Sequence, residues 1–235
     1  MTAVPTRFPE GVTQTAKDSF LALTRAPFPA GPAVGQPVEY CQDFMQDFVP
    51  PYTIVSDGGG GETFLLTRSD PFGVLRYVQA TGQTATVARL DGVAFTVRTD
   101  KSLWYQTRIR VFETGSGFRI GLGNNAGVTT FTEAIYFISE ENETDISIEV
   151  RNGGTLVETQ VIGTAITNGY MEMAYWIDER LNMHVYFAGR EVAVISLVLA
   201  STPIGIPLTP FIALAEAGAE TPEIRTDYIN VAQDR

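Results

Sequence analysis

After residue 37, apolar and polar residues alternate along most of the chain. In the clearest example, LWYQTRIRVF at residues 103–112, apolar residues alternate with tryptophan, glutamine and arginine. A period of two predicts a strand with one buried face and one face in contact with water. Helical periodicity is convincing nowhere, so we expect an all-β protein.

Glycine, asparagine, aspartate and proline separate these segments at short intervals. Many short strands at this spacing predict a jelly-roll sandwich of two antiparallel sheets. The expected strands are Val38–Phe48, Thr53–Val55, Thr63–Arg68, Val74–Tyr77, Thr84–Leu90, Ala94–Thr96, Leu103–Phe112, Phe118–Leu122, Ala134–Ile138, Asp145–Val150, Thr155–Ile162, Tyr170–Ile177, Met183–Phe187, Glu191–Leu199, Phe211–Ala215 and Thr226–Val231.

Short connecting sequences predict how neighbouring strands pair. Thr114-Gly115-Ser116-Gly117 predicts a hairpin between 103–112 and 118–122. Arg151-Asn152-Gly153-Gly154 predicts another, because Asn-Gly readily adopts the positive φ angles of tight turns. Residues 170–199 read as a meander of three strands.

Residues 1–37 have a different composition and are expected to form an extended N-terminal arm, with the sandwich occupying 38–235. Six of the 13 prolines lie in this segment, which disfavours long strands and helices. The segment carries a formal charge of +1, which leaves −12 on 38–235.

The charge and composition of the whole chain exclude several classes of protein. With 235 residues, of which 44% are hydrophobic and 18% charged, the chain can bury a substantial core and is not disordered. A formal charge of −11 argues against nucleic acid as a partner, because phosphates would be repelled. Acidic membrane surfaces are disfavoured for the same reason.

Cysteine and histidine are too scarce for most metal sites. The single cysteine, Cys41, cannot form an internal disulfide, which indicates folding in a reducing cytoplasm. With His184 as the single histidine, no zinc, haem or iron–sulfur site is expected, although a calcium site built from oxygen ligands stays open. We expect no cofactor, no secretion signal and no membrane span.

Paired carboxylates on a strand are the first candidates for chemistry. Glu143, Asp145 and Glu149 would share one face of a strand and resemble the catalytic strand of laminarinase-like glycoside hydrolases. Strand rise places Glu143 and Glu149 about 20 Å apart, beyond the roughly 5–9.5 Å that glycoside hydrolysis requires. Glu143 and Asp145 alone are near enough, but the acidic run before the strand suggests a solvated turn. We therefore expect no enzyme activity and no catalytic residues.

Histidine and aromatic residues give weaker signals. His184 lies in an alternating strand without the partners of a catalytic triad, so a surface or cross-strand position is expected. Four aromatic residues could form a platform for a sugar, but apolar neighbours favour core packing. They are Trp104, Tyr105, Tyr175 and Trp176.

The two ends of the chain carry a resemblance to a known family. Thr6–Thr13 (TRFPEGVT), followed by Ala16-Lys17-Asp18, resembles the opening of a family of tailed-bacteriophage virion proteins that are encoded near the major capsid protein. The closing segment Asp227–Arg235 (DYINVAQDR) is similar to the last strand of that family. Weaker matches lie at 40–44, 134–138 and 147–152.

The resemblance implies a concanavalin-like or laminin-G-like sandwich with a structural, non-enzymatic role. The implied protein is a capsid decoration or cement protein that binds the outer face of the major capsid protein shell, on the virion exterior, after synthesis in the host cytoplasm. We expect a homo-oligomer, with a trimer at a local threefold axis as its form. In the arm, Phe8 would act as an apolar plug, Arg7 as a charge partner and Pro9 as a fixed bend.

Two other functions stay open at this stage. A glycan-binding module of a virion fibre or spike would need exposed aromatic residues or a loop ordered by calcium. A glycosidase would depend on Glu143.

Overall fold

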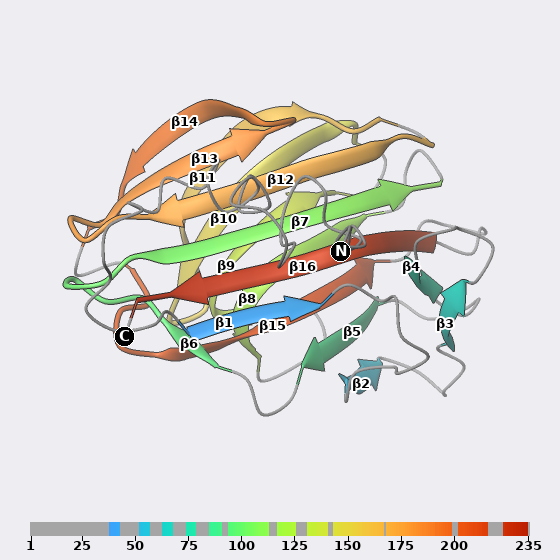
Figure 1. Cartoon of the computed structure of the whole chain (residues 1–235), viewed down its shortest axis with the longest axis horizontal. Helices are drawn as coiled ribbons and strands as arrows, with labels where there is room; N and C mark the ends of the chain where they lie inside the picture. The colour runs from blue at the N-terminus through green and yellow to red at the C-terminus, as the bar shows by residue number, and fades with distance from the viewer. Residues whose placement is uncertain are drawn as a thin grey trace, which may run out of the picture.

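The computed structural model describes the chain as two stacked β-sheets (Figure 1). The residues that it describes are 38–42, 52–56, 63–67, 74–78, 85–90, 94–112, 117–125, 131–140, 143–166, 168–198, 202–215 and 223–234. The predicted arm, with Arg7, Phe8 and Pro9, lies outside them. Among the described residues, no helix has the length and apolar character needed to cross a bilayer.

Sheet A has eight strands and forms the front layer in Figure 1. Its order is β14-β13-β12-β7-β16-β4-β3, with β1 also paired to β16. The strands are β1 (Val38–Gln42), β3 (Thr63–Thr67), β4 (Val74–Val78), β7 (Leu103–Val111), β12 (Tyr170–Ile177), β13 (Asn182–Phe187), β14 (Arg190–Ser196) and β16 (Glu223–Gln233).

Sheet B also has eight strands and lies behind sheet A (Figure 1). Its order is β11-β10-β9-β8-β15-β5-β2, with β6 paired to β15. The strands are β2 (Tyr52–Ser56), β5 (Ala85–Leu90), β6 (Phe95–Thr96), β8 (Phe118–Asn125), β9 (Phe131–Ser139), β10 (Asp145–Asn152), β11 (Thr155–Thr164) and β15 (Pro207–Ala215).

The main core lies between the two sheets and is built by the alternation seen in the sequence. On β7, Leu103, Tyr105 and Ile109 are fully buried and point toward sheet B. They meet residues such as Phe137 on β9 and Ile148 on β10. The predicted all-β, two-sheet antiparallel sandwich is confirmed, and most predicted strands agree with the observed ones to within a few residues.

Two of the three predicted connections are confirmed. Asn152 pairs with Thr155, and the intervening Gly153 and Gly154 have φ angles of 58° and 78°, as a tight hairpin turn requires. Strands β12, β13 and β14 form the expected meander.

The predicted hairpin between 103–112 and 118–122 is wrong. Strand β7 pairs with β12 and β16 in sheet A, whereas β8 pairs with β9 and β15 in sheet B. The chain therefore crosses from one sheet to the other between these strands. A glycine-rich connection is compatible with either path, and only the long-range partners of each strand decide between them.

Candidate functional site

The outer face of sheet A, which points away from sheet B, carries an unusual set of side chains. On β7 this face holds Trp104, Gln106, Arg108 and Arg110, the residues that alternate with the core. On β12, Trp176 lies opposite Trp104, Ala174 opposite Gln106 and Glu172 opposite Arg108. On β16, Asn230 lies opposite Gln106. On β13, Tyr186 lies opposite Ala174.

A groove of about 420 Å³ lies on this face. Its volume falls in the range of about 300–1,000 Å³ that is typical of small-ligand sites. The lining residues are Trp104, Gln106, Glu172, Ala174, Tyr186, Ala188, Gly189 and Arg190. We call this feature the outer groove; its floor is buried and its rim at 188–190 is exposed.

The sequence predicts that Trp104 and Gln106 belong to a face in contact with water, but each is only 2% exposed. Gln106 Nε2 donates hydrogen bonds to Glu172 Oε1 at 2.6 Å and to the hydroxyl of Tyr228 at 3.2 Å. These bonds fix the orientation of the amide, because a carboxylate can only accept. The carboxylate of Glu172 and the amide of Gln106 thus form one polar unit in the groove.

Acceptor atoms on this face have no hydrogen-bond partner among the described residues. They are Gln106 Oε1 and Asn230 Oδ1, which belong to side chains 2% and 4% exposed. A buried acceptor without a partner costs about 1–3 kcal/mol. Such atoms are rare in folded proteins, where buried polar groups are bonded to protein groups, to ordered water or to a ligand.

Aromatic rings form the wall of the groove. The rings of Trp104 and Tyr186 lie 5.7 Å apart between centroids, and Trp176 stacks on His184 at 4.7 Å. The Tyr186 hydroxyl donates to Glu191 Oε2 at 3.2 Å. Burial, together with the charge of Glu191, raises the pKa of Tyr186 to about 12, so Tyr186 remains a neutral phenol at physiological pH.

The rim of the groove is a tight turn between β13 and β14. Ala188 has a φ of 50° and Gly189 a φ of 75°. The left-handed region is unfavourable for alanine, and here the Ala188 amide donates to the Glu172 carbonyl at 2.9 Å. The turn is therefore tied to the strand that supplies Glu172.

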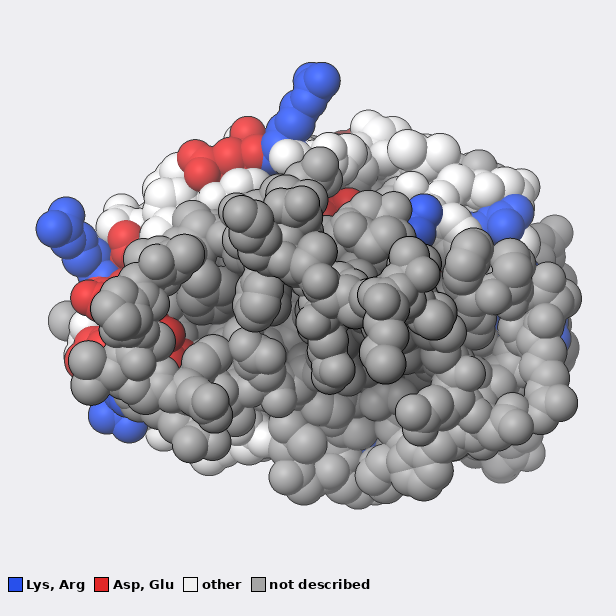
Figure 2. All heavy atoms as spheres, viewed as in Figure 1, with Lys and Arg blue, Asp and Glu red and all other residues white. Residues whose placement is uncertain are grey.

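Charges of both signs lie next to each other on the described part of this side of the molecule (Figure 2). In the upper-left part of the view, acidic side chains adjoin basic ones. The net charge of −11 therefore does not make this face uniformly acidic.

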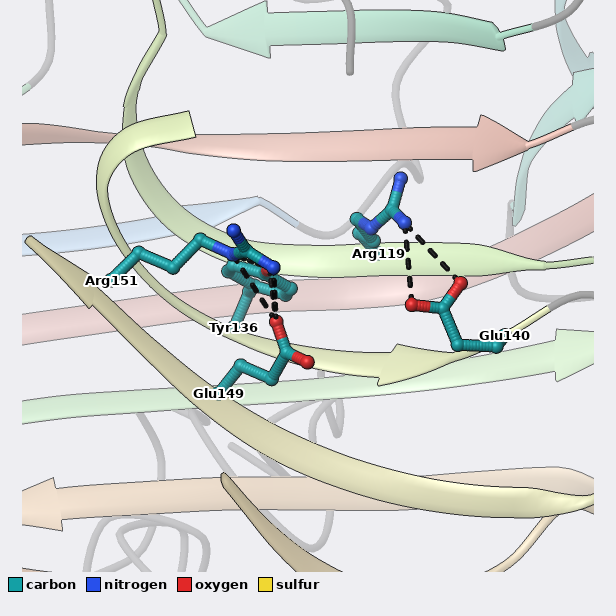
Figure 3. Close-up of polar contacts among 5 residues, drawn as sticks. All are labelled: Arg119, Tyr136, Glu140, Glu149 and Arg151. Carbon is teal, nitrogen blue, oxygen red and sulfur yellow. Dashed lines mark hydrogen bonds and ion pairs between the residues drawn. The ribbon is translucent and has the colours of Figure 1, made fainter. Parts of the chain in front are cut away.

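The outer face of sheet B carries a second polar cluster, which we call the sheet B cluster: Tyr136, Glu149 and Arg151 (Figure 3). The Tyr136 hydroxyl donates to Glu149 Oε2 at 2.5 Å, and Arg151 Nε donates to the Tyr136 oxygen at 2.6 Å. Burial and the hydrogen bond to Glu149 raise the pKa of Tyr136 well above its usual range.

The sheet B cluster is satisfied by its own members. Arg151 also pairs with Glu149 at 3.3 Å, and close by Arg119 pairs with Glu140 at 3.3 Å (Figure 3). Around it lies a buried apolar group in which Phe131 and Phe211 stack with centroids 4.3 Å apart. This arrangement stabilises the sheet.

The predicted carboxylates lie in different surroundings. Strand β10 begins at Asp145, and Glu143 precedes it in a turn closed by a hydrogen bond from its amide to the Glu140 carbonyl. Glu143 and Asp145 are exposed, whereas Glu149 is buried in the sheet B cluster. The interpretation of 140–143 as an acidic turn agrees with this hydrogen bond.

The aromatic candidates divide between the core and the outer groove. Tyr105 and Tyr175 are fully buried and stack in the core at 5.2 Å, as predicted. Trp104 is also buried, in a small hydrophobic cluster against which Trp176 packs, but this cluster lies on the outer face of sheet A and not between the sheets. His184 lies cross-strand from Trp176, as expected.

Sequence reasoning did not find Glu172, Tyr186 or Gln106 as site residues. They come from β12, β13 and β7, and only the register of the strands brings them together. The alternation in 103–112 predicted exposure for Gln106, but no local signal indicated a shared groove. Among the described residues, no group of three or more metal-ligating side chains is close enough to hold an ion.

No protein-family model matches the chain, and no curated protein sequence matches it. Solved structures with a similar fold include a protein of unknown function from Shewanella oneidensis MR-1, with a TM-score of 0.60, 12% identity, and coverage of 94% of this chain and 95% of that one.

Two further neighbours are named for carbohydrates. The carbohydrate recognition domain of Emp47p has a TM-score of 0.58 and 12% identity, covering 82% of this chain and 94% of that one. A β-glucanase from Bacillus licheniformis has a TM-score of 0.56 and 10% identity, covering 84% and 98%. At these identities the comparisons establish the fold alone: the chain is a concanavalin-like sandwich of two antiparallel sheets.

Proposed function

We propose that this protein is a non-enzymatic glycan-binding module and that its ligand occupies the outer groove. The observation that carries the proposal is the combination of an aromatic wall with buried, incompletely paired amide groups. The flat, weakly polar face of a sugar ring packs against aromatic side chains, while its hydroxyl groups donate to amide and carboxylate oxygens.

Each part of the groove has a role in this proposal. Tyr186 and the edge of Trp104 supply the apolar contact. Gln106 Oε1 accepts a hydrogen bond from a sugar hydroxyl, and Glu172 accepts another. A site built to hydrogen-bond hydroxyl groups discriminates strongly against ligands that lack them, because its buried polar groups would then stay unpaired.

Hydrolysis is not part of the proposal. Glycosidases use two carboxyl groups about 5–9.5 Å apart on either side of the scissile bond. Glu172 is the one carboxylate among the described residues that line the groove, and it is engaged by Gln106. The two fold neighbours named for carbohydrate recognition and glucan hydrolysis agree with a sugar ligand, but the side chains of this groove support binding.

The test is a glycan array probed with the full chain, its Tyr186→Ala variant and a Leu156→Ala control. Leu156 lies on β11 of sheet B and is 41% exposed. We expect the chain to bind a defined set of glycans, Tyr186→Ala to weaken binding at least tenfold, and Leu156→Ala to bind normally. Thermal unfolding of each variant verifies that it is folded. No binding to any glycan, or equal binding by both variants, would contradict the proposal.

A second proposal, that the protein decorates a tailed-phage capsid, is favoured by one sequence observation, the phrase Arg7-Phe8-Pro9-Glu10-Gly11-Val12-Thr13. In this proposal the partner is the major capsid protein, and the chain forms a homo-oligomer, expected to be a trimer, on the virion exterior. Deleting residues 1–20 should abolish binding to purified shells; retention at full occupancy would remove the arm from this mechanism. Glycan binding by the sandwich is compatible with either a decoration protein or a fibre.

A further inference from the structure

Four arginines lie side by side next to the outer groove and form what we call the arginine strip: Arg76, Arg108, Arg110 and Arg225. Arg110 of β7 is in register with Arg225 of β16, which is in turn in register with Arg76 of β4. Arg108 lies two residues from Arg110 on the same face of β7. In a chain with a net charge of −11, this clustering of cations on one face is notable.

Three members of the strip form ion pairs with carboxylates. Arg76 and Arg225 both pair with Glu223, at 2.6 and 2.8 Å. These interactions hold the pKa of Glu223 below its ordinary value, despite a partial burial that acts in the opposite direction. Arg108 pairs with Asp227 at 2.9 Å.

Arg110 is the exception. Its guanidinium carbon lies 4.3 Å from the ring centroid of Phe112 and 6.0 Å from that of Tyr170. The side chain is half-buried and forms no ion pair or hydrogen bond with the described residues, and its Nε is buried without a partner. Aromatic contacts orient the guanidinium plane without using its hydrogen-bond donors.

An oriented, partly desolvated guanidinium that has no carboxylate partner in the described part of the chain is suited to an anionic group from outside. Its planar donors match the oxygens of a carboxylate or a sulfate, with two parallel hydrogen bonds. The neighbouring Arg108 and Arg225 add positive charge, although their own carboxylates offset it. Partial burial strengthens the interaction relative to one in bulk water.

Arg110 lies close enough to the outer groove for one ligand to contact both the groove and the Arg110 guanidinium. Four residues of strand separate Arg110 from Gln106, which corresponds to about 13 Å along β7. Both side chains are on the outer face; on β12, Tyr170 is in register with Arg110 and Ala174 with Gln106. A short oligosaccharide can span this distance along the strand direction.

We propose that the ligand of the outer groove is an acidic oligosaccharide, in which one sugar ring occupies the groove while a carboxylate or sulfate group on a neighbouring ring binds Arg110. This inference rests on the proposed function and adds the chemical class of the ligand. Arg110 supplies the contact that selects acidic over neutral sugars, and Tyr186 and Gln106 hold the ring.

The experiment is an array on which uronate-containing, sialylated and sulfated oligosaccharides are each printed beside a neutral counterpart: the methyl ester, the desialylated form or the desulfated form. The probes are the full chain, Arg110→Gln and Arg98→Gln. Arg98 is the matched control because it is exposed, pairs with Asp100 and lies outside the strip. We expect at least tenfold tighter binding of acidic members, reduced by Arg110→Gln to the level of the neutral ones and unchanged by Arg98→Gln.

Several outcomes separate the two proposals. Preference for uronates and sialic acids identifies a carboxylate ligand, and preference for sulfated members identifies a sulfate. Equal binding of acidic and neutral members, with loss in Tyr186→Ala, would overturn the acidic ligand and leave the glycan-binding function standing. Absence of all glycan binding would remove both. Arg110→Lys, which keeps the charge but loses the planar fork, should retain only part of the preference.

Discussion

The outer faces of the two sheets contain similar residues but use them differently. On sheet B, Tyr136, Glu149 and Arg151 satisfy one another, and the rings of Phe131 and Phe211 pack beside them. On sheet A, Gln106 and Asn230 keep acceptors without partners among the described residues, and Arg110 forms no ion pair with any of those residues. Polar and aromatic side chains stabilise a sheet when they are mutually paired, and they are available to a ligand when they are not.

The largest effect is expected at Gly121 on β8 of sheet B. A Cβ at this position would lie 2.6 Å from Tyr136 Cα and would also collide with the Ile135 carbonyl oxygen. Because backbone atoms cannot move aside cheaply, Gly121→Ala should lower the free energy of unfolding by about 3 kcal/mol or more. Urea unfolding measures the loss.

The control for this prediction is Gly123→Ala, two residues further along β8. Its Cβ would meet ring atoms of Phe211 and Phe131 at 3.0–3.1 Å, and these side chains can shift slightly. A loss in Gly123→Ala as large as that in Gly121→Ala would show that close backbone packing is not what sets the effect.

Removing one hydroxyl from the sheet B cluster should have the next largest effect. Tyr136→Phe leaves Glu149 without its closest donor, so we expect a loss of about 2 kcal/mol in the free energy of unfolding. Arg119→Gln breaks an ion pair with Glu140, whose side chain is 52% exposed, and should change stability by only about 0.5 kcal/mol. Glycan binding should be normal in both variants. A binding defect in Tyr136→Phe would mean that the ligand binds the outer face of sheet B and would contradict the assignment to the outer groove.

The corresponding change on sheet A should spare stability and remove binding. Gln106→Leu eliminates a buried unpaired acceptor, which offsets the loss of its hydrogen bonds to Glu172 and to the Tyr228 hydroxyl. We expect a change of about 1 kcal/mol or less in unfolding and a loss of glycan affinity of about tenfold or more. Gln160→Leu, at an exposed position on β11, is the matched control and should bind like the parent chain.

The smallest effect is a difference in alkaline stability. The pKa of Tyr186 is raised from 10.0 to about 12 in the folded protein, so the unfolded chain loses this proton first as the pH rises. The corresponding stability is present below pH 10 and is lost between pH 10 and about 12. The stability of Tyr186→Phe should therefore fall less steeply with pH in this range. Urea midpoints measured at each pH give the slope. An identical slope would mean that Tyr186 ionises normally in the folded state.

Local sequence pattern was sufficient to predict most strands and one tight turn. The alternation in β7 predicts which residues belong to the core, and Gly153 and Gly154 have the positive φ angles that a short turn demands. These properties depend on sterics and solvation within a few residues, so they can be predicted without knowing the partner strand.

Pairing across long sequence distances could not be predicted in this way. Gln106 meets Glu172 and Tyr228 over separations of 66 and 122 residues, and β7 and β8 belong to different sheets although they are consecutive. The sequence of a strand determines which of its side chains share a face, because the backbone imposes a period of two. Which neighbours lie beside it, and whether its outer face becomes a packed cluster or a groove, depends on the register of distant strands, and only the tertiary structure decides it.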